Sequence, residues 1–435
     1  MKREIILLLV CILGVRCSSS KTTATPEMVT GTPETVAAED SLSPHEIFER
    51  AYNNYQSFEN LTYEWTINGE GNKHRSVYNI AQIMFWCVNN NGDVIVADEG
   101  RIKIFDDEGN EKKLLPKVGE GRAYAVFAGP DGHLLVFDAQ KYSGDLNRCL
   151  NTSYIDNEFN LYNPDYSLVT KRILGDKLEL EEFFNSRNDL PRNIAFVGKV
   201  YPISDTEIVY EAFLNNYLSN RVELNAELFY ESEHAVTSLA RIRMDYMVND
   251  PVYSAWTGLG ELHWGVLPGK KIMYINPWED FFVDTEYYYT IHVIDINNNT
   301  EEKLIHPFKP VAFEDSKLNP DTTGYKFDWF KNGLVQTAEL AREKNIYAPV
   351  FRLKLDGNYA FVFPYTESNF KGDYYSELNQ VADVFDLDKG EFIHRVTMPF
   401  LPYEIKNGCA YQRSSDENDV PIIRKYTIDP SVYGK

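Results

Sequence analysis

Asn91-Gly92-Asp93-Val94-Ile95-Val96-Ala97-Asp98 is the stretch of sequence that decides the fold. Asp131-Gly132 and Asp356-Gly357 open two further copies, and each pair is followed by a run of aliphatic or aromatic residues. Glycine, Asn and Asp tolerate a positive φ, so an Asn-Gly or Asp-Gly pair before such a run predicts a tight turn that leads into a β-strand. The sequence therefore predicts a repeating antiparallel β protein.

A second recurring unit predicts the outer hairpins of the repeat. An apolar pair precedes a polar turn, and further strand residues follow; copies begin at Ile104, Val293 and Val384, with weaker ones at Leu161 and Phe229. The last predicted strand, residues 422–428, has no hairpin partner after it, and residues 61–67 are its natural partner. Such pairing between the two ends of a chain closes a ring of sheets and leaves no open edge.

These repeats predict an all-β fold, a six-bladed β-propeller in which five blades are complete and one is built from both ends of the chain. A seven-bladed ring with a degenerate blade is the alternative. We expect a short N-terminal helix over residues 44–55, where a capping box begins, and small helical insertions over residues 178–185 and 327–343.

The first residues predict export. A short basic start precedes an apolar run over residues 5–15, which is typical of a secretory signal and too short to span a bilayer, a task that takes about 20 residues. We expect residues 1–17 to be a lipoprotein-type signal peptide and Cys17 to be lipidated. Arg16 stands where such signals carry a small residue, so ordinary cleavage after Ser19 is the alternative.

The rest of the chain divides into two predicted parts. Residues 18–42 are rich in Thr, Pro, Ala and Glu without hydrophobic periodicity, which predicts a disordered tether. Residues 43–435 are expected to form the propeller domain with its N-terminal helix. The predicted location is the bacterial cell envelope, in the periplasm or at the outer membrane, with the lipid anchor as the membrane contact.

Charge and cysteine usage limit the partners. The chain carries 65 acidic and 43 basic residues, a formal net charge of −22. An acidic body repels phosphate backbones, so nucleic acid is not expected as a partner, whereas an envelope protein or peptide is. Cys87, Cys149 and Cys409 have no Cys-x-x-Cys spacing, which argues against a zinc site or a disulfide scaffold.

Two segments carry a family resemblance. The first contains Gly92-Asp93-Val94-Ile95-Val96-Ala97-Asp98, Arg101-Ile102-Lys103-Ile104-Phe105-Asp106 and Gly119-Glu120-Gly121. The second contains Phe392-Ile393-His394-Arg395-Val396-Thr397-Met398-Pro399-Phe400, followed by Ile405-Lys406-Asn407-Gly408. Here the chain resembles the NHL-repeat and TolB-like six-bladed β-propeller lipoproteins of bacterial cell envelopes. The resemblance implies the fold and an envelope location, and some related propellers are hydrolases, lactonases or lyases.

No local motif predicts catalysis. The sequence lacks a phosphate-binding glycine loop, a Gly-x-Ser-x-Gly elbow and His-Glu-x-x-His spacing. The segment that starts at Asp295 resembles a calcium loop, but Thr300 and His306 stand where glycine and glutamate belong, which favours a β-turn. We therefore predict no catalytic residue, no metal ligand and no cofactor.

Aromatic residues beside carboxylates are weak candidates for ligand binding, since they can stack on sugars or contact peptides and cations. Packing between blades is the favoured interpretation of the same residues. The candidates are Trp278, Phe281, Tyr287, Tyr289, Trp329, Tyr365 and Tyr374.

The sequence thus predicts an envelope-anchored binding or scaffold protein rather than an enzyme. One alternative is a propeller hydrolase or lyase with a metal such as Ca²⁺ in its central channel. Another is a carbohydrate-associated surface protein.

Overall fold

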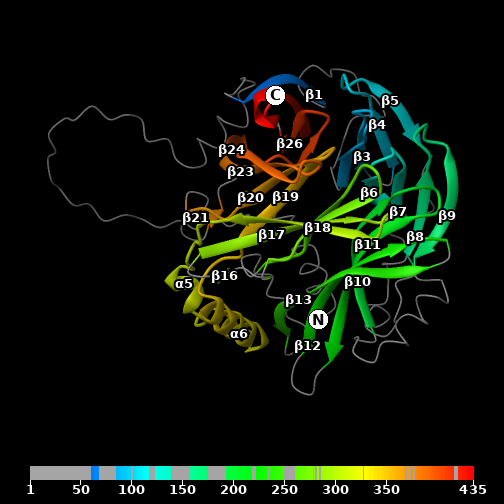
Figure 1. Cartoon of the computed structure of the whole chain (residues 1–435). Coiled ribbons are helices and arrows are strands. Elements are labelled where there is room, and N and C mark those ends of the chain that lie inside the picture. The colour runs from blue at the N-terminus through cyan, green and yellow to red at the C-terminus, as the bar shows by residue number, and fades with distance from the viewer. Residues whose placement is uncertain are drawn as a thin grey trace, which may run out of the picture.

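Six antiparallel sheets stand in a ring and form the blades of a β-propeller (Figure 1). The computed structural model describes residues 60–67, 85–98, 101–116, 123–138, 157–174, 193–217, 222–233, 235–248, 260–277, 279, 282–283, 286–326, 328–367, 370–371, 374–375, 378–415 and 420–435. The expected signal peptide, tether and N-terminal helix, and the expected helix over residues 178–185, lie outside the described residues.

Each blade has a four-stranded path from the channel outward. Blade 1 contains β2 (Phe85–Val88), β3 (Val94–Asp98), β4 (Arg101–Phe105) and β5 (Glu111–Leu115). Blade 2 contains β6 (Ala123–Ala128), β7 (Leu134–Asp138), β8 (Asn157–Tyr162) and β9 (Leu168–Leu174). Blade 3 contains β10 (Asn193–Pro202), β11 (Ile208–Tyr217), β12 (Val222–Glu231) and β13 (Val236–Val248).

The remaining blades carry the irregular additions. Blade 4 contains β14 (His263–Leu267), β15 (Lys271–Ile275), β17 (Glu286–Asp295) and β18 (Thr300–Pro307), and β16 (Phe282–Val283) also pairs with β17. Blade 5 contains β19 (Val350–Asp356), β20 (Tyr359–Pro364), β23 (Leu378–Asp386) and β24 (Glu391–Phe400), with a small hairpin of β21 (Phe370–Lys371) and β22 (Tyr374–Tyr375). Blade 6 contains β25 (Glu404–Lys406), β26 (Cys409–Ser415), β27 (Pro421–Ile428) and β1 (Leu61–Ile67).

The tight turns adopt the backbone geometry that their sequence predicts. Gly92, Gly132 and Gly357 have φ values of 81°, 94° and 56°, in the left-handed region that glycine enters without steric cost. At Gly92 a Cβ atom would lie 2.7 Å from the Asp107 carboxyl carbon, so a larger residue there would displace the Asp107 side chain.

The two ends of the described chain meet in blade 6, as the unpaired final strand predicts. β1 pairs antiparallel with β27, with Leu61 opposite Ile428 and Ile67 opposite Ile423. The closing strands also bond to blade 1, because the Lys425 Nζ lies 2.7 Å from the Asp107 Oδ1. The ring is therefore closed by backbone pairing and by an ion pair across the junction.

The hydrophobic core lies between blades. Six clusters of buried residues are found among the described residues, and each cluster joins one pair of neighbouring blades. Between blades 1 and 2, for example, Ile95 and Ile104 pack with Val126 and Val136. Six interfaces in a closed circle establish six blades and overturn the seven-bladed alternative.

Helices occupy the connection between blades 4 and 5. α5 (Asp315–Leu318) is short, and α6 (Asp328–Lys344) matches the helix expected over residues 327–343. Ala338 and Ala341 on α6 are buried. A 3-10 helix, η3 (Pro430–Tyr433), ends the chain against blade 5, to whose cluster it adds Val432 and Tyr433. No helix of the described residues is long and apolar enough to cross a bilayer.

Candidate ligand-binding channel

The innermost strands of the blades surround a central channel. β2 contacts β6 and β25, β6 contacts β10, and β19 contacts β14 and β25. These innermost strands all run along the channel in the same direction. The turns that follow them therefore meet at one end of the channel. We call this end the turn mouth.

Hydrogen bonds between successive blades hold the turn mouth together. The Asp356 carboxylate at the end of β19 accepts hydrogen bonds from the backbone N–H of Asn407 at 2.6 Å and of Gly408 at 2.8 Å, both in the turn after β25. The Tyr433 hydroxyl donates to the same carboxylate at 2.7 Å. Both oxygens of this buried acid are thus occupied, and blade 5 is joined to blade 6.

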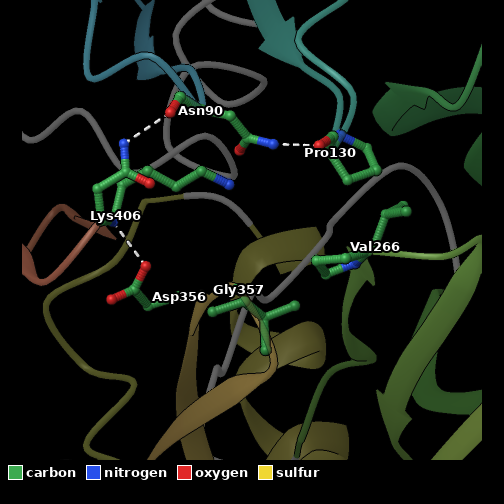
Figure 2. A pocket seen from close by; sticks show the side chains of 9 residues that line it. Asn90, Pro130, Val266, Asp356, Gly357 and Lys406 are labelled. Carbon is green, nitrogen blue, oxygen red and sulfur yellow. Dashed lines mark hydrogen bonds between the residues drawn. The ribbon is translucent and has the colours of Figure 1, made fainter.

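The same chain of bonds continues into blades 1 and 2. The Asn407 side-chain amide donates to the Asn90 carbonyl at 2.9 Å, and the Asn90 amide donates to the Pro130 carbonyl (Figure 2). Farther out, His133 of blade 2 contacts Asp205 of blade 3 with its Nε2 at 2.5 Å. Polar contacts on one face therefore link the turns of successive blades.

A cavity of about 300 Å³ lies inside the turn mouth. Five blades contribute to its walls, because each supplies residues from the turn after its innermost strand. The Lys406 side chain extends into the middle of this cavity (Figure 2). The lining residues are Asn90, Pro130, Val266, Pro268, Leu355, Asp356, Gly357, Lys406 and Asn407.

Deeper in the channel, two carboxylates each lie beside a cationic side chain. The Arg352 guanidinium lies 4.0 Å from the Glu261 Oε1, and the Lys354 ammonium lies 3.9 Å from the Glu404 Oε2. Lys354 also donates to the Tyr403 carbonyl. Burial lowers the pKa of Lys354 to about 8, helped by Arg352 and opposed by Glu404. Lys354 remains mostly protonated at neutral pH.

His263 and Glu211 are buried groups that the channel cations influence. Burial lowers the pKa of His263 to about 4, so the ring is neutral at pH 7, and its Nε2 lies 3.0 Å from the Val350 carbonyl. Burial raises the pKa of Glu211 to about 7, although the Lys199 charge opposes the change. The Trp264 Nε1 donates to this carboxyl at 3.2 Å.

The described channel residues carry charges of both signs with a small positive excess. Lys199, Arg352, Lys354 and Lys406 come from three blades, and the carboxylates Glu261, Glu404 and Asp356 offset most of their charge. None of these residues is among the site residues predicted from the sequence. Their signal was the alternation of charged residues directly before two turns, in Arg352-Leu353-Lys354 and Glu404-Ile405-Lys406.

Those predicted aromatic candidates whose side chains the structure describes lie apart from the turn mouth. Tyr289 and Tyr365 are 1% and 4% exposed and belong to the inter-blade core, which fits the packing interpretation. Tyr287 is half-buried, with its ring centroid 5.8 Å from that of Phe308.

The other aromatic candidates and Cys17 remain predictions. Trp329 lies in α6 and Tyr374 in β22, but their side chains are outside the described set. Trp278, Phe281 and Cys17 lie outside the described residues altogether.

The structure also places the calcium-like segment and the cysteines. Asp295 accepts bonds from the Asn298 backbone N–H at 3.1 Å and side chain at 2.8 Å, in the turn between β17 and β18, as the β-turn interpretation predicts. Within the described residues no group of three or more His, Cys, Asp or Glu side chains is arranged to hold a metal ion. Cys87 and Cys409 carry free thiols, and Cys149 lies outside the described residues.

Comparisons with solved structures find β-propellers. BamB from Moraxella catarrhalis is 8% identical, with 85% of this chain and 100% of that chain covered at a TM-score of 0.32. Virginiamycin B lyase from Staphylococcus aureus is 8% identical, with 80% and 97% covered at a TM-score of 0.33. The β-propeller domain of the trilobed protease from Pyrococcus furiosus is 8% identical, with 78% and 79% covered at 0.31.

No family model matches the chain, and no curated protein matches its sequence. The likenesses to solved structures are too distant to carry an argument about function. The six inter-blade clusters and the pairing of β1 with β27 identify the chain on its own evidence as a six-bladed β-propeller.

Proposed function

We propose that this protein is an exported binding or scaffold protein of the bacterial cell envelope, which holds its ligand at the turn mouth of the propeller. The observation that carries the proposal is the cavity there, into which Lys406 extends from a wall built by five blades. A fold of this kind hosts many functions, so the function is inferred from the site.

The turn mouth has the properties of a preorganised binding site. Its wall residues Asp356, Asn407 and Asn90 are fixed by hydrogen bonds between blades, so little conformational entropy is lost when a ligand binds. The cavity volume of about 300 Å³ is at the lower end of the range of ligand pockets. A small ligand or one side chain of a partner protein fits this space.

The chemistry of the channel supports binding over metal-assisted catalysis. A channel metal would need carboxylates to coordinate it, whereas Glu261 and Glu404 each lie next to a cationic side chain. A bound cation there would have to compete with Arg352 and Lys354 for the same oxygens. The hydrolase or lyase with a channel metal is therefore the less supported function.

The envelope location is the part of the proposal that rests on sequence. The basic and apolar start of the chain, Cys17 and the segment over residues 18–42 support a lipid-anchored protein on a tether. The resemblance to NHL-repeat and TolB-like propeller lipoproteins supports the same location. We propose the envelope protein or peptide as the partner class on this basis.

Site-specific cross-linking in living cells tests the binding function. A photoreactive amino acid replaces Pro268, which is exposed and lines the cavity, and in the control it replaces Leu168, which is 52% exposed on β9 of blade 2. We expect a discrete cross-linked product from the Pro268 position alone. The same products from both positions, or none from either, would count against the proposal.

A further inference from the structure

We infer that the group bound at the turn mouth is a carboxylate, held by the Lys406 ammonium. This inference rests on the proposed binding function and adds the chemistry of the ligand. The carboxylate belongs either to a small free acid or to an acidic side chain of a peptide or protein.

Lys406 differs from the cations deeper in the channel. Among the described residues, Arg352 and Lys354 each lie within 4.0 Å of a glutamate, whereas no described carboxylate lies within that distance of the Lys406 ammonium. Its side chain is half-buried and extends into the cavity (Figure 2). An ammonium in a cavity with no described anionic partner can form a charge-assisted hydrogen bond with an incoming anion.

Asp356 is not the anionic partner of the Lys406 ammonium, although it is part of the same wall. Its two oxygens accept hydrogen bonds from Asn407, Gly408 and Tyr433, so its charge is stabilised on the blade 5 to blade 6 junction. The Asp356 carboxylate therefore holds the turn that carries Lys406 and leaves the ammonium itself available to a ligand.

The charges behind Lys406 favour an anion over a cation. Lys199, Arg352 and Lys354 lie deeper in the channel, and in the part of the chain that the structure describes Glu261 pairs with Arg352 and Glu404 with Lys354. The chain as a whole carries a formal net charge of −22, so a cationic ligand would be attracted to the outer surface rather than to this channel.

The hydrogen-bonding groups of the mouth favour a carboxylate over a phosphate. Phosphate recognition uses several N–H donors around one group. Here the side-chain N–H groups of Asn90 and Asn407 already donate to the Pro130 and Asn90 carbonyls, and the backbone N–H groups of Asn407 and Gly408 donate to Asp356. Among the described side chains of the wall, the Lys406 ammonium is the cationic donor, which suits a singly charged carboxylate.

Calorimetric titration of the purified full-length protein tests the inference with defined probes. The probes are glutarate as a small acid, a pentaglutamate peptide as an acidic segment, and inorganic phosphate. Glutaramide and pentaglutamine are the neutral controls. Tighter binding of glutarate assigns a small free acid as the source of the carboxylate, and tighter binding of the peptide assigns an acidic segment of a partner.

Two pairs of variants locate the binding. Lys406→Gln should weaken carboxylate binding about 10-fold or more, the value of one charge-assisted hydrogen bond, and Lys309→Gln, at a lysine exposed elsewhere, should leave it unchanged. Pro268→Asp should weaken binding relative to Pro268→Asn, because the two variants differ in one charge at the cavity wall. The second pair keeps the test valid if Lys406→Gln is poorly folded.

Several results would overturn the inference. These are the absence of carboxylate binding up to millimolar concentration, an equal loss in the Lys406 and Lys309 variants, or tighter binding of phosphate than of either carboxylate. If no carboxylate binds but a specific cross-link forms at position 268, the binding function is supported and the ligand has a different chemistry. If a carboxylate binds and no cross-link forms, the inference is supported and a protein is excluded as the source of the carboxylate.

Discussion

Glu211 provides a quantitative test of the channel electrostatics. The residue is 6% exposed, and its carboxyl lies against Trp264 and the β10 backbone, where a Cβ atom on Gly198 would be 2.8 Å from the Glu211 Oε2. Burial raises its pKa from an ordinary 4.5 to about 7, and the Glu261 charge adds to the rise while Lys199 and Trp264 oppose it. The folded state therefore binds a proton that the unfolded state has released over this pH range.

The sign of the effect follows from proton linkage. Because the folded pKa of this acid lies above the unfolded value, the free energy of unfolding decreases as the pH rises from 4.5 towards 7 and then levels off. At about 1.4 kcal/mol per pH unit, the loss between pH 5.5 and pH 8 is about 2 kcal/mol. Glu211→Gln keeps an oxygen acceptor for the Trp264 Nε1 and removes the titration.

Urea unfolding of the two proteins at pH 5.5 and pH 8 measures this difference. We expect the free energy of unfolding of Glu211→Gln to rise by about 2 kcal/mol relative to that of the wild type between pH 5.5 and pH 8. This expectation holds whatever the difference between the two proteins at pH 5.5. Glu302→Gln, at an exposed acid on β18, should show the same change in the free energy of unfolding between the two pH values as the wild type. If Glu211→Gln also shows the wild-type change, the Glu211 carboxyl is ionised in the folded protein and the prediction is refuted.

Three further predictions concern closure and anchoring. Leu61→Ala removes a side chain that is 1% exposed in the closing strand and should lower the free energy of unfolding by about 2–5 kcal/mol, against at most about 0.5 kcal/mol for the exposed Leu168→Ala in urea titrations. Lys425→Met removes the contacts to Asp107 and Glu64 and should destabilise by about 1 kcal/mol, with a smaller difference at high salt; an unchanged difference would argue against an ionic contribution. Cys17→Ser should abolish incorporation of a labelled fatty acid in cells, whereas labelling that persists would remove Cys17 as the lipidation site.

The sequence by itself determined the repeating architecture. Asn-Gly and Asp-Gly pairs need left-handed backbone at glycine, so the turns at Gly92, Gly132 and Gly357 were predictable from neighbouring residues alone. The unpaired final strand likewise predicted the β1 partner, since an exposed edge is unfavourable in a closed ring. The helix at α6 followed from its own periodicity.

Only the tertiary structure decided the candidate site. Glu261, Arg352 and Lys406 are distant in sequence, and in the sequence alone a charged residue is typical of a solvated surface. Ring closure brings their innermost strands together around one channel. Charged side chains of different blades therefore interact with one another there. The aromatic residues show the converse, because inter-blade packing buries Tyr289 and Tyr365 at positions that local sequence could not distinguish from exposed ones.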